Sequence, residues 1–294
     1  MVQAILGVLG VMTLGFGAIF VKDFAAHKDE LEDNSWGVTA GIGFVANFFD
    51  TLGIGSFAPT TAMLKFFKQT KDRIIPGTLN VGCTIPVVLE AFIFIAVIDV
   101  EIITLVSMLA SATAGAFLGA GIVAKFDERK VQLVMGFALL ATAFLMTSGQ
   151  MGWTASLGTG EAIGLTGGKL IFAIVANFVL GALMTAGVGL YAPCMALVYM
   201  LGMSPRVAFP IMMGSCAFLM PVASIKFIKE AAYDRKASMA MTLAGAVGVF
   251  IAAFIVKSLP LNILSWLVIG VVLYTSITML RSAAKNKKTE KSAA

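Results

Sequence analysis

Charge is scarce in this sequence. Asp, Glu, Lys and Arg make up only 13% of the 294 residues, whereas 59% are hydrophobic and the mean hydropathy is +0.95. A soluble domain of this length cannot bury so much apolar surface in one core, so an ordinary soluble protein is excluded. The composition therefore predicts an all-α polytopic membrane protein.

Residues that bind metals or form disulfides are also rare. The chain has one histidine, His27, and its three cysteines, Cys83, Cys194 and Cys216, lie inside apolar segments without a CxxC pair. Neither a metal centre nor a disulfide framework is expected. The sequence contains no HExxH motif and no Walker A motif. We therefore expect no cofactor and no enzymatic activity, and ATP drive would require another subunit.

The net charge of +5 does not indicate a nucleic-acid partner. Lys and Arg lie in short loops between apolar segments and in the KNKKTEK tail, instead of forming one basic face. The positive-inside rule explains this distribution, because cytoplasmic loops of membrane proteins carry an excess of Lys and Arg. We expect the lipid bilayer, and no nucleic acid, as the surrounding partner.

Seven apolar runs are long enough to cross about 30 Å of hydrocarbon. No basic residue precedes the first run, which predicts a retained span and not a cleaved signal peptide. Two further blocks, residues 36–67 and 169–203, are too long and too rich in glycine to be single plain spans. The seven runs are residues 2–21, 77–98, 102–124, 131–151, 207–228, 238–256 and 261–280.

One motif occurs twice. VANF at Val45–Phe48 returns at Val175–Phe178, and T-x-G-[IV]-G-x-[FY]-A-P follows each copy, at Thr51–Pro59 and Thr185–Pro193. The second copy has four more residues between the two parts. This self-similarity predicts two related halves. The expected order is an N-terminal span with an acidic loop, a first repeat, a linker, a second repeat and a basic tail, at residues 1–35, 36–151, 152–168, 169–281 and 282–294.

The basic loops predict how the halves cross the membrane. If each glycine-rich block crossed once, basic loops would lie on both sides. If each block is a re-entrant helical hairpin, loops 65–73, 125–130 and 226–236 and the tail are all cytoplasmic, as the positive-inside rule favours. Each half then adds three full crossings, so the halves form inverted-topology repeats. We expect a multi-pass protein of the bacterial inner membrane with a cytoplasmic C-terminus.

The paired glycines predict a binding site. Gly53 and Gly55, like Gly187 and Gly189, would free backbone groups that hydrocarbon cannot satisfy, so such breaks need protein or a watery cavity around them. A second half-helix of about 15 residues would then aim its N–H groups and the positive end of its dipole at the membrane centre. Two such ends suit a small anion. The candidate substrate-binding residues are Asn47, Thr51, Gly53, Gly55, Ser56, Thr60, Asn177, Thr185, Gly187, Gly189 and Cys194.

A simpler interpretation stays open for the same residues. Glycines also let transmembrane helices pack closely, and Asn47 and Asn177 could be hydrogen-bonding glue between helices. Two carboxyl groups, Asp50 and Glu90, lie at membrane depth, where ionisable groups are costly and usually functional. Glu90 is our candidate for proton coupling, with Asp50 beside the first break. The alternative for Glu90 is a structural carboxyl that is protonated or paired with a lysine.

The doubled break resembles the sulfite exporter TauE/SafE family, also called toluene-sulfonate uptake permeases. The resemblance rests on N-F near the start of each break, on G-x-G-x-x-A-P after it, and on two four-segment halves, and it covers residues 36–281. It implies a carrier of sulfite, sulfonates or other sulfur-containing anions. The extra residues of the second copy argue against a fully symmetric site. The resemblance implies site-forming roles for Asn47, Gly53, Gly55, Pro59, Asn177, Gly187, Gly189 and Pro193.

These observations together predict a secondary transporter for a small sulfur oxyanion, working by alternating access. Proton coupling is a subsidiary hypothesis. The alternatives are a passive anion channel and a membrane-embedded assembly factor or enzyme. The sequence is compatible with a homo-oligomer.

Overall fold

The computed structural model describes residues 2–96, 98–153, 160–254 and 261–293. Eleven α-helices and two short 3-10 turns, η1 (Asp72–Ile74) and η2 (Pro205–Val207), make up the regular structure, with no strand among the described residues. The predicted all-α class is confirmed. The helices are α1 (Val2–Ala26), α2 (Trp36–Thr51), α3 (Phe57–Phe66), α4 (Ile75–Ile95), α5 (Ile102–Val123), α6 (Glu128–Gln150), α7 (Gly167–Met184), α8 (Tyr191–Met200), α9 (Ala208–Lys229), α10 (Arg235–Phe254) and α11 (Leu261–Ala293).

Seven helices of the described chain are long and apolar enough to cross a membrane: α1, α4 with η1, α5, α6, α7, α9 and α10. Six of them match predicted apolar runs, and α7 is the first arm of the second glycine-rich block. The predicted span 261–280 falls within α11, whose helix continues to Ala293. The expected tail is therefore a continuation of the last helix. Within the predicted linker 152–168, residues 154–159 lie outside the described residues.

Both glycine-rich blocks are broken helices. The first break separates α2 from α3 at residues 52–56, and the second separates α7 from α8 at residues 185–190. The predicted length of about 15 residues is wrong for the second half-helices, because α3 and α8 have only 10 residues each, whereas α2 has 16 and α7 has 18. Positive φ angles follow both short helices, at Lys68 (53°) and Gly202 (83°). A 10-residue helix is about 15 Å long, half of the hydrocarbon thickness.

The same backbone turn ends α2 and α7. The N–H of Gly53 donates to the carbonyl of Asp50 (2.8 Å), and the N–H of Gly187 donates to that of Met184 (3.0 Å). In each copy the next N–H reaches one carbonyl further back, which completes a Schellman motif. This motif requires a left-handed residue, and φ is +90° at both Gly53 and Gly187. The first glycine of each motif therefore terminates a helix.

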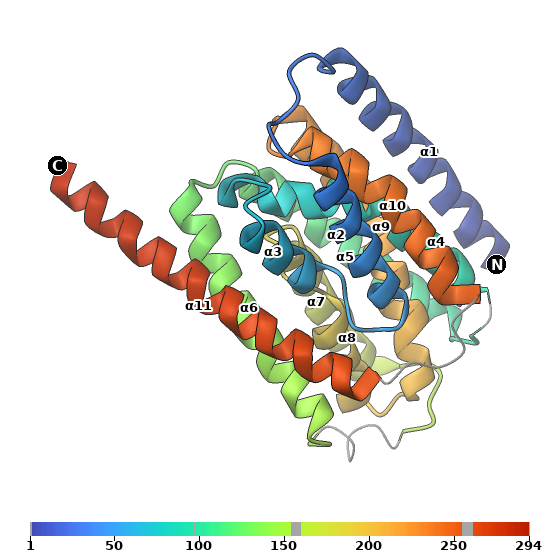
Figure 1. Ribbon diagram of the computed structural model, residues 1–294. Helices are drawn as coiled ribbons and strands as arrows, with labels where there is room; N and C mark the ends of the chain where they lie inside the picture. The colour runs from blue at the N-terminus through green and yellow to red at the C-terminus, as the bar shows by residue number, and fades with distance from the viewer. Residues whose placement is uncertain (1, 97, 154–159, 255–260, 294) are drawn as a thin grey trace.

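Each half of the chain packs against a helix of the other half (Figure 1). Helix α2 lies along α10, α7 lies along α5, and α4 contacts α9 between them. A Cβ at Gly248 of α10 would collide with the backbone of Phe44, and a Cβ at Gly115 of α5 would collide with that of Phe178. These glycines, which lie outside the two motifs, serve the close helix packing of the simpler interpretation.

The short helices occupy the middle of the bundle (Figure 1). Helix α1 lies on one outer edge, against α9 and α4, and α11 lies on the other edge, against α6 and α3. The C-terminal end of α11 projects beyond the other helices. Residues 52–56 and 185–190, which form the two breaks, are buried or half-buried. The direction in which each half crosses the membrane stays a prediction.

Candidate functional site

The two helix breaks face one another. A Cβ at Gly55 would lie 3.7 Å from the Cβ of Tyr191, the first residue of α8, and a Cβ at Gly189 would lie 3.8 Å from the Cβ of Phe57, the first residue of α3. These reciprocal contacts bring the N-terminal ends of α3 and α8 together. Of the two glycines, Gly55 has φ +89°, whereas Gly189 is not among the residues with positive φ. The breaks correspond in position but not in every backbone angle.

Glu90 bridges the breaks from α4. Its Oε1 lies 3.0 Å from Thr51 Oγ1, at the end of α2, and its Oε2 accepts a hydrogen bond of 2.8 Å from the hydroxyl of Tyr191. The side chain of Glu90 is completely buried, and Thr51 and Tyr191 are at most 5% exposed. No lysine takes part in this arrangement among the described residues, so the alternative of a Lys-paired carboxyl does not apply.

Asp50 spans the first break. Ser56, the N-cap residue of α3, donates a hydrogen bond of 2.7 Å from its Oγ to Asp50 Oδ2 and makes no side-chain cap on its own helix. The first N–H groups of an α-helix have no partner within the helix. Those of Phe57 and Ala58 therefore have no partner within α3, whereas Pro59 has no N–H.

The first break also holds polar atoms without partners. Asn47 Oδ1, Asp50 Oδ1 and Thr60 Oγ1 are buried and have no hydrogen-bond partner in the part of the chain that the structure describes. Leaving a buried polar group unpaired costs about 1–3 kcal/mol. Such a cluster is expected where a ligand or a proton binds.

The polar groups of the second break are more fully used by the fold. Asn177 Nδ2 donates to Met108 O (2.8 Å) and Ser215 Oγ (2.9 Å), joining α7 to α5 and α9. Thr185 Oγ1 donates to Ala182 O of its own helix (2.7 Å). The amide nitrogen of Asn177 therefore acts as interhelical glue. Its Oδ1 is buried without a partner among the described residues.

The cysteines are buried near this centre. Cys194 lies on α8, and the thiol of Cys216 on α9 lies 3.5 Å from Met184 Sδ. No group of three or more potential metal ligands occurs among the described residues. Sequence reasoning included Cys194 but missed Tyr191. A signal for Tyr191 was present, because Tyr and Phe alternate at one position of the repeated motif and only one of them carries a hydroxyl.

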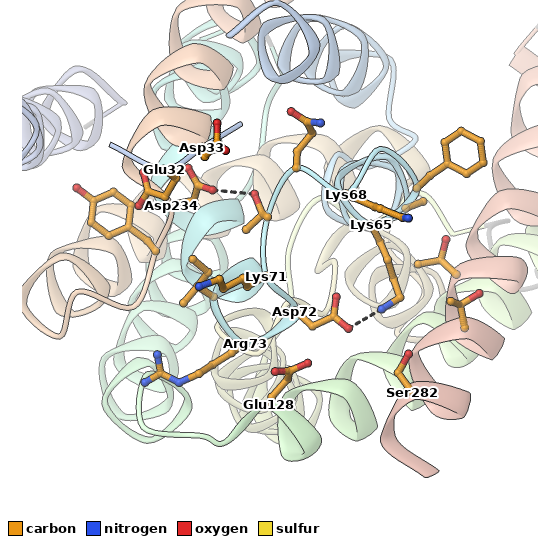
Figure 2. A pocket seen from close by; sticks show the side chains of 18 of the residues that line it. Glu32, Asp33, Lys65, Lys68, Lys71, Asp72, Arg73, Glu128, Asp234 and Ser282 are labelled. Carbon is orange, nitrogen blue, oxygen red and sulfur yellow. Dashed lines mark hydrogen bonds and ion pairs between the residues drawn. The ribbon is translucent and has the colours of Figure 1, made fainter. Parts of the chain in front are cut away.

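A polar cavity of about 1090 Å³ lies at the other end of α3, away from the breaks (Figure 2). Lys65 from the last turn of α3 forms an ion pair with Asp72 (2.5 Å), and Thr70 donates to Asp234 (3.1 Å) across the opposite wall. Lys68 points toward the same space. Because side chains of both signs line the cavity, its charge alone does not select an anion. It lies beside the predicted cytoplasmic loops.

The sulfite exporter TauE/SafE family matches residues 170–294. The second half of the chain is TauE/SafE-like. This match to less than half of the chain supports the family predicted from the doubled break, and with the seven apolar helices it supports a multi-pass transport protein of the membrane. No curated protein and no solved structure matches the chain.

Proposed function

We propose that this TauE/SafE-like chain is a secondary transporter for a small sulfur-containing oxyanion, such as sulfite or an organosulfonate. The observation that carries the proposal is the meeting of the two helix breaks inside the bundle, with the first turns of α3 and α8 side by side. The family match supports the class of cargo.

The site suits a compact anion. Exposed N–H groups and the positive end of a helix dipole favour negative charge, and the hydroxyls of Ser56 and Thr60 lie in or beside the first turn of α3. Neither break contains Lys or Arg. Dipoles and hydroxyl donors would therefore hold the anion without a counter-charge, which favours a small oxyanion over a polyphosphate.

Alternating access follows from the packing of the halves. The pairs α2–α10 and α7–α5 are equivalent if the chain contains two repeats related by a pseudo-two-fold axis. Inverted repeats of this kind can rock around a central site and open it to either side in turn. The re-entrant course of α2–α3 and α7–α8 belongs to the same proposal.

Proton coupling follows from the two carboxyl groups. An anion that arrives between the helix ends would be repelled by ionised Asp50 or Glu90 in surroundings of low dielectric constant. Protonated carboxyls would instead donate hydrogen bonds, and Asp50 Oδ1 has no competing partner among the described residues. We propose that the anion and at least one proton bind together.

Ligand-induced stabilisation tests the site. The purified protein is heated with sulfite, sulfate, thiosulfate, taurine, sulfoacetate or chloride, and the variants Ser56→Ala and Thr60→Val are compared with Thr13→Val on the outer helix α1. Selective stabilisation by one sulfur anion is expected. Loss of one hydrogen bond to a charged group should weaken its binding about tenfold or more in both site variants. Equal binding by the site variants and wild type would disprove the site.

Flux measurements separate a carrier from a channel. In proteoliposomes, a carrier gives saturating uptake and counterflow of labelled sulfite, whereas a channel gives neither. Under an imposed pH gradient, Glu90→Gln should abolish the proton-driven part of the uptake. Unchanged pH-driven uptake in this variant would exclude Glu90 as the coupling group.

A further inference from the structure

We infer that Tyr191 is a positioning residue. Its hydrogen bond to Glu90 transmits the protonation state of this carboxyl to the second helix break. Its part in transport rests on the proposed function, whereas its effect on Glu90 rests on geometry alone. Tyr191 opens α8, and its hydroxyl is the second of the two side-chain donors that reach the Glu90 carboxyl. The Glu90 carboxyl therefore links the end of α2 with the beginning of α8.

This link has no equivalent on the other side of the pseudo-two-fold axis. The motif position of Tyr191 is filled in the first copy by Phe57, which has no hydroxyl. If Cys83 is aligned with Cys216, the position of Glu90 is filled by Ala223, which is also buried. The counterpart of Thr51 is Thr185, whose hydroxyl donates to Ala182 O of its own helix and to no other group among the described residues. The hydrogen-bonded link through Glu90 therefore has no symmetry-related copy, although the two breaks are similar.

The bridge can form whether Glu90 is ionised or protonated. Thr51 Oγ1 has one hydrogen and two neighbours, Asn47 O at 2.9 Å and Glu90 Oε1 at 3.0 Å. When Glu90 is ionised, Thr51 donates to it. When Oε1 carries a proton, Glu90 donates to Thr51, which then donates to Asn47 O. No heavy atom has to move at the first break.

At the second break, the strength of the hydrogen bond depends on whether Glu90 is ionised or protonated. The hydroxyl of Tyr191 donates to Glu90 Oε2 in either state, but a hydrogen bond to a carboxylate is about twice as strong as one to a neutral acid. The titratable groups that face Glu90 are Asp50 from α2, Tyr191 from α8, Cys83 from its own helix and Cys216 from α9. None of these is cationic, so the two hydroxyls stabilise the ionised form. Protonation would loosen the hold of α4 on α8.

Infrared titration of the detergent-solubilised full chain tests this inference without any transport. The carbonyl band of protonated Glu90 is identified as the band that disappears in Glu90→Gln. In Tyr191→Phe the ionised carboxylate loses one of its two donors, so the midpoint of this band should rise by about 1–2 pH units. Tyr274→Phe removes an exposed phenol from α11 and should leave the midpoint unchanged.

An unchanged midpoint in a folded Tyr191→Phe protein would overturn the inference. A second arm measures sulfite uptake against pH, where Tyr191→Phe should shift the profile by the same amount and have no further effect in a Glu90→Gln background. If wild type shows no saturable uptake of a sulfur anion, the proposed function fails, and the infrared titration still decides the role of Tyr191. If uptake falls at every pH without a shift, Tyr191 has only a structural role.

Discussion

Asp234 shows how one carboxyl organises the predicted cytoplasmic side. It lies between α9 and α10 and is 1% exposed. It accepts hydrogen bonds from the N–H of Ala237 (2.8 Å), from Asn34 Nδ2 (2.8 Å) and from Thr70 Oγ1 (3.1 Å). Burial raises the pKa of Asp234 to about 6, and the nearby charge of Glu32 adds to the rise, while the three hydrogen bonds oppose it.

This pKa predicts a stability that falls as the pH rises. In the unfolded chain the carboxyl loses its proton near its ordinary pKa of 3.8, whereas the folded protein keeps the proton until about pH 6. Asp234 therefore contributes at most about 3 kcal/mol to the free energy of unfolding. This contribution is complete below pH 4 and is lost as the pH rises through about 6. Thermal unfolding between pH 4 and 7.5 should show this slope in wild type and a smaller one in Asp234→Asn.

Asp127 provides the matched control for this prediction. It is the exposed N-cap of α6, and the hydrogen bond from the N–H of Lys130 lowers its pKa. The contribution of Asp127 to stability is therefore present above its ordinary pKa and is lost only at lower pH. The variant Asp127→Asn should keep the slope of stability against pH that wild type shows near pH 6. An equal slope in wild type and Asp234→Asn would show that other groups cause it.

At the scale of helices, close backbone contact between α5 and α7 predicts a sharp contrast between two glycines. Ala at Gly115 would force its methyl group into the backbone of Phe178, whereas Gly7 on α1 has nothing within 4 Å of such a group. Gly115→Ala should lower the free energy of unfolding by about 1–3 kcal/mol. Gly7→Ala should leave it unchanged or raise it by up to about 1 kcal/mol. Unfolding in mixed detergent measures both, and equal effects would contradict the packing described for α5 and α7.

The helices show which features a sequence predicts. Apolar runs and the paired glycines located most spans and both breaks, because span length and helix termination depend on nearby residues. The length of α3 was not predicted, since it depends on a left-handed conformation at Lys68, a residue type that rarely adopts it. Which glycines pack and which break helices was also not predictable, because close packing depends on a partner such as Phe178 far away in the chain.

Some features of the candidate site were predictable from the sequence and others were not. Thr51, Ser56 and Asp50 were predicted because they lie within or beside the repeated motif. The bond between Glu90 and Tyr191 was not predicted, because it joins residues 101 positions apart through the packing of α4 against the second break.

For the whole molecule, the predicted orientation can be tested with single cysteines. The three native cysteines are buried, so they should give little background with an impermeant maleimide. Cysteines at Lys68, Lys125 and Glu230 should be labelled from one side of the membrane, and those at Asp99 and Glu161 from the other. Labelling of Glu230→Cys from the side of Asp99→Cys would mean that the second glycine-rich block crosses the membrane once.

The exchange of helix partners between the halves has a consequence for biosynthesis. Helix α2 is made early, but its main partner α10 is made late, and Asn34 and Asp234, which are bonded, stand 200 residues apart. At about 5–20 residues per second, the ribosome needs about 10–40 s to add that length. During this interval α2 is without its final neighbour. A chain that stops after α6 would therefore lack the helices against which α2 and α5 pack. We expect the cell to degrade it as an incompletely folded protein.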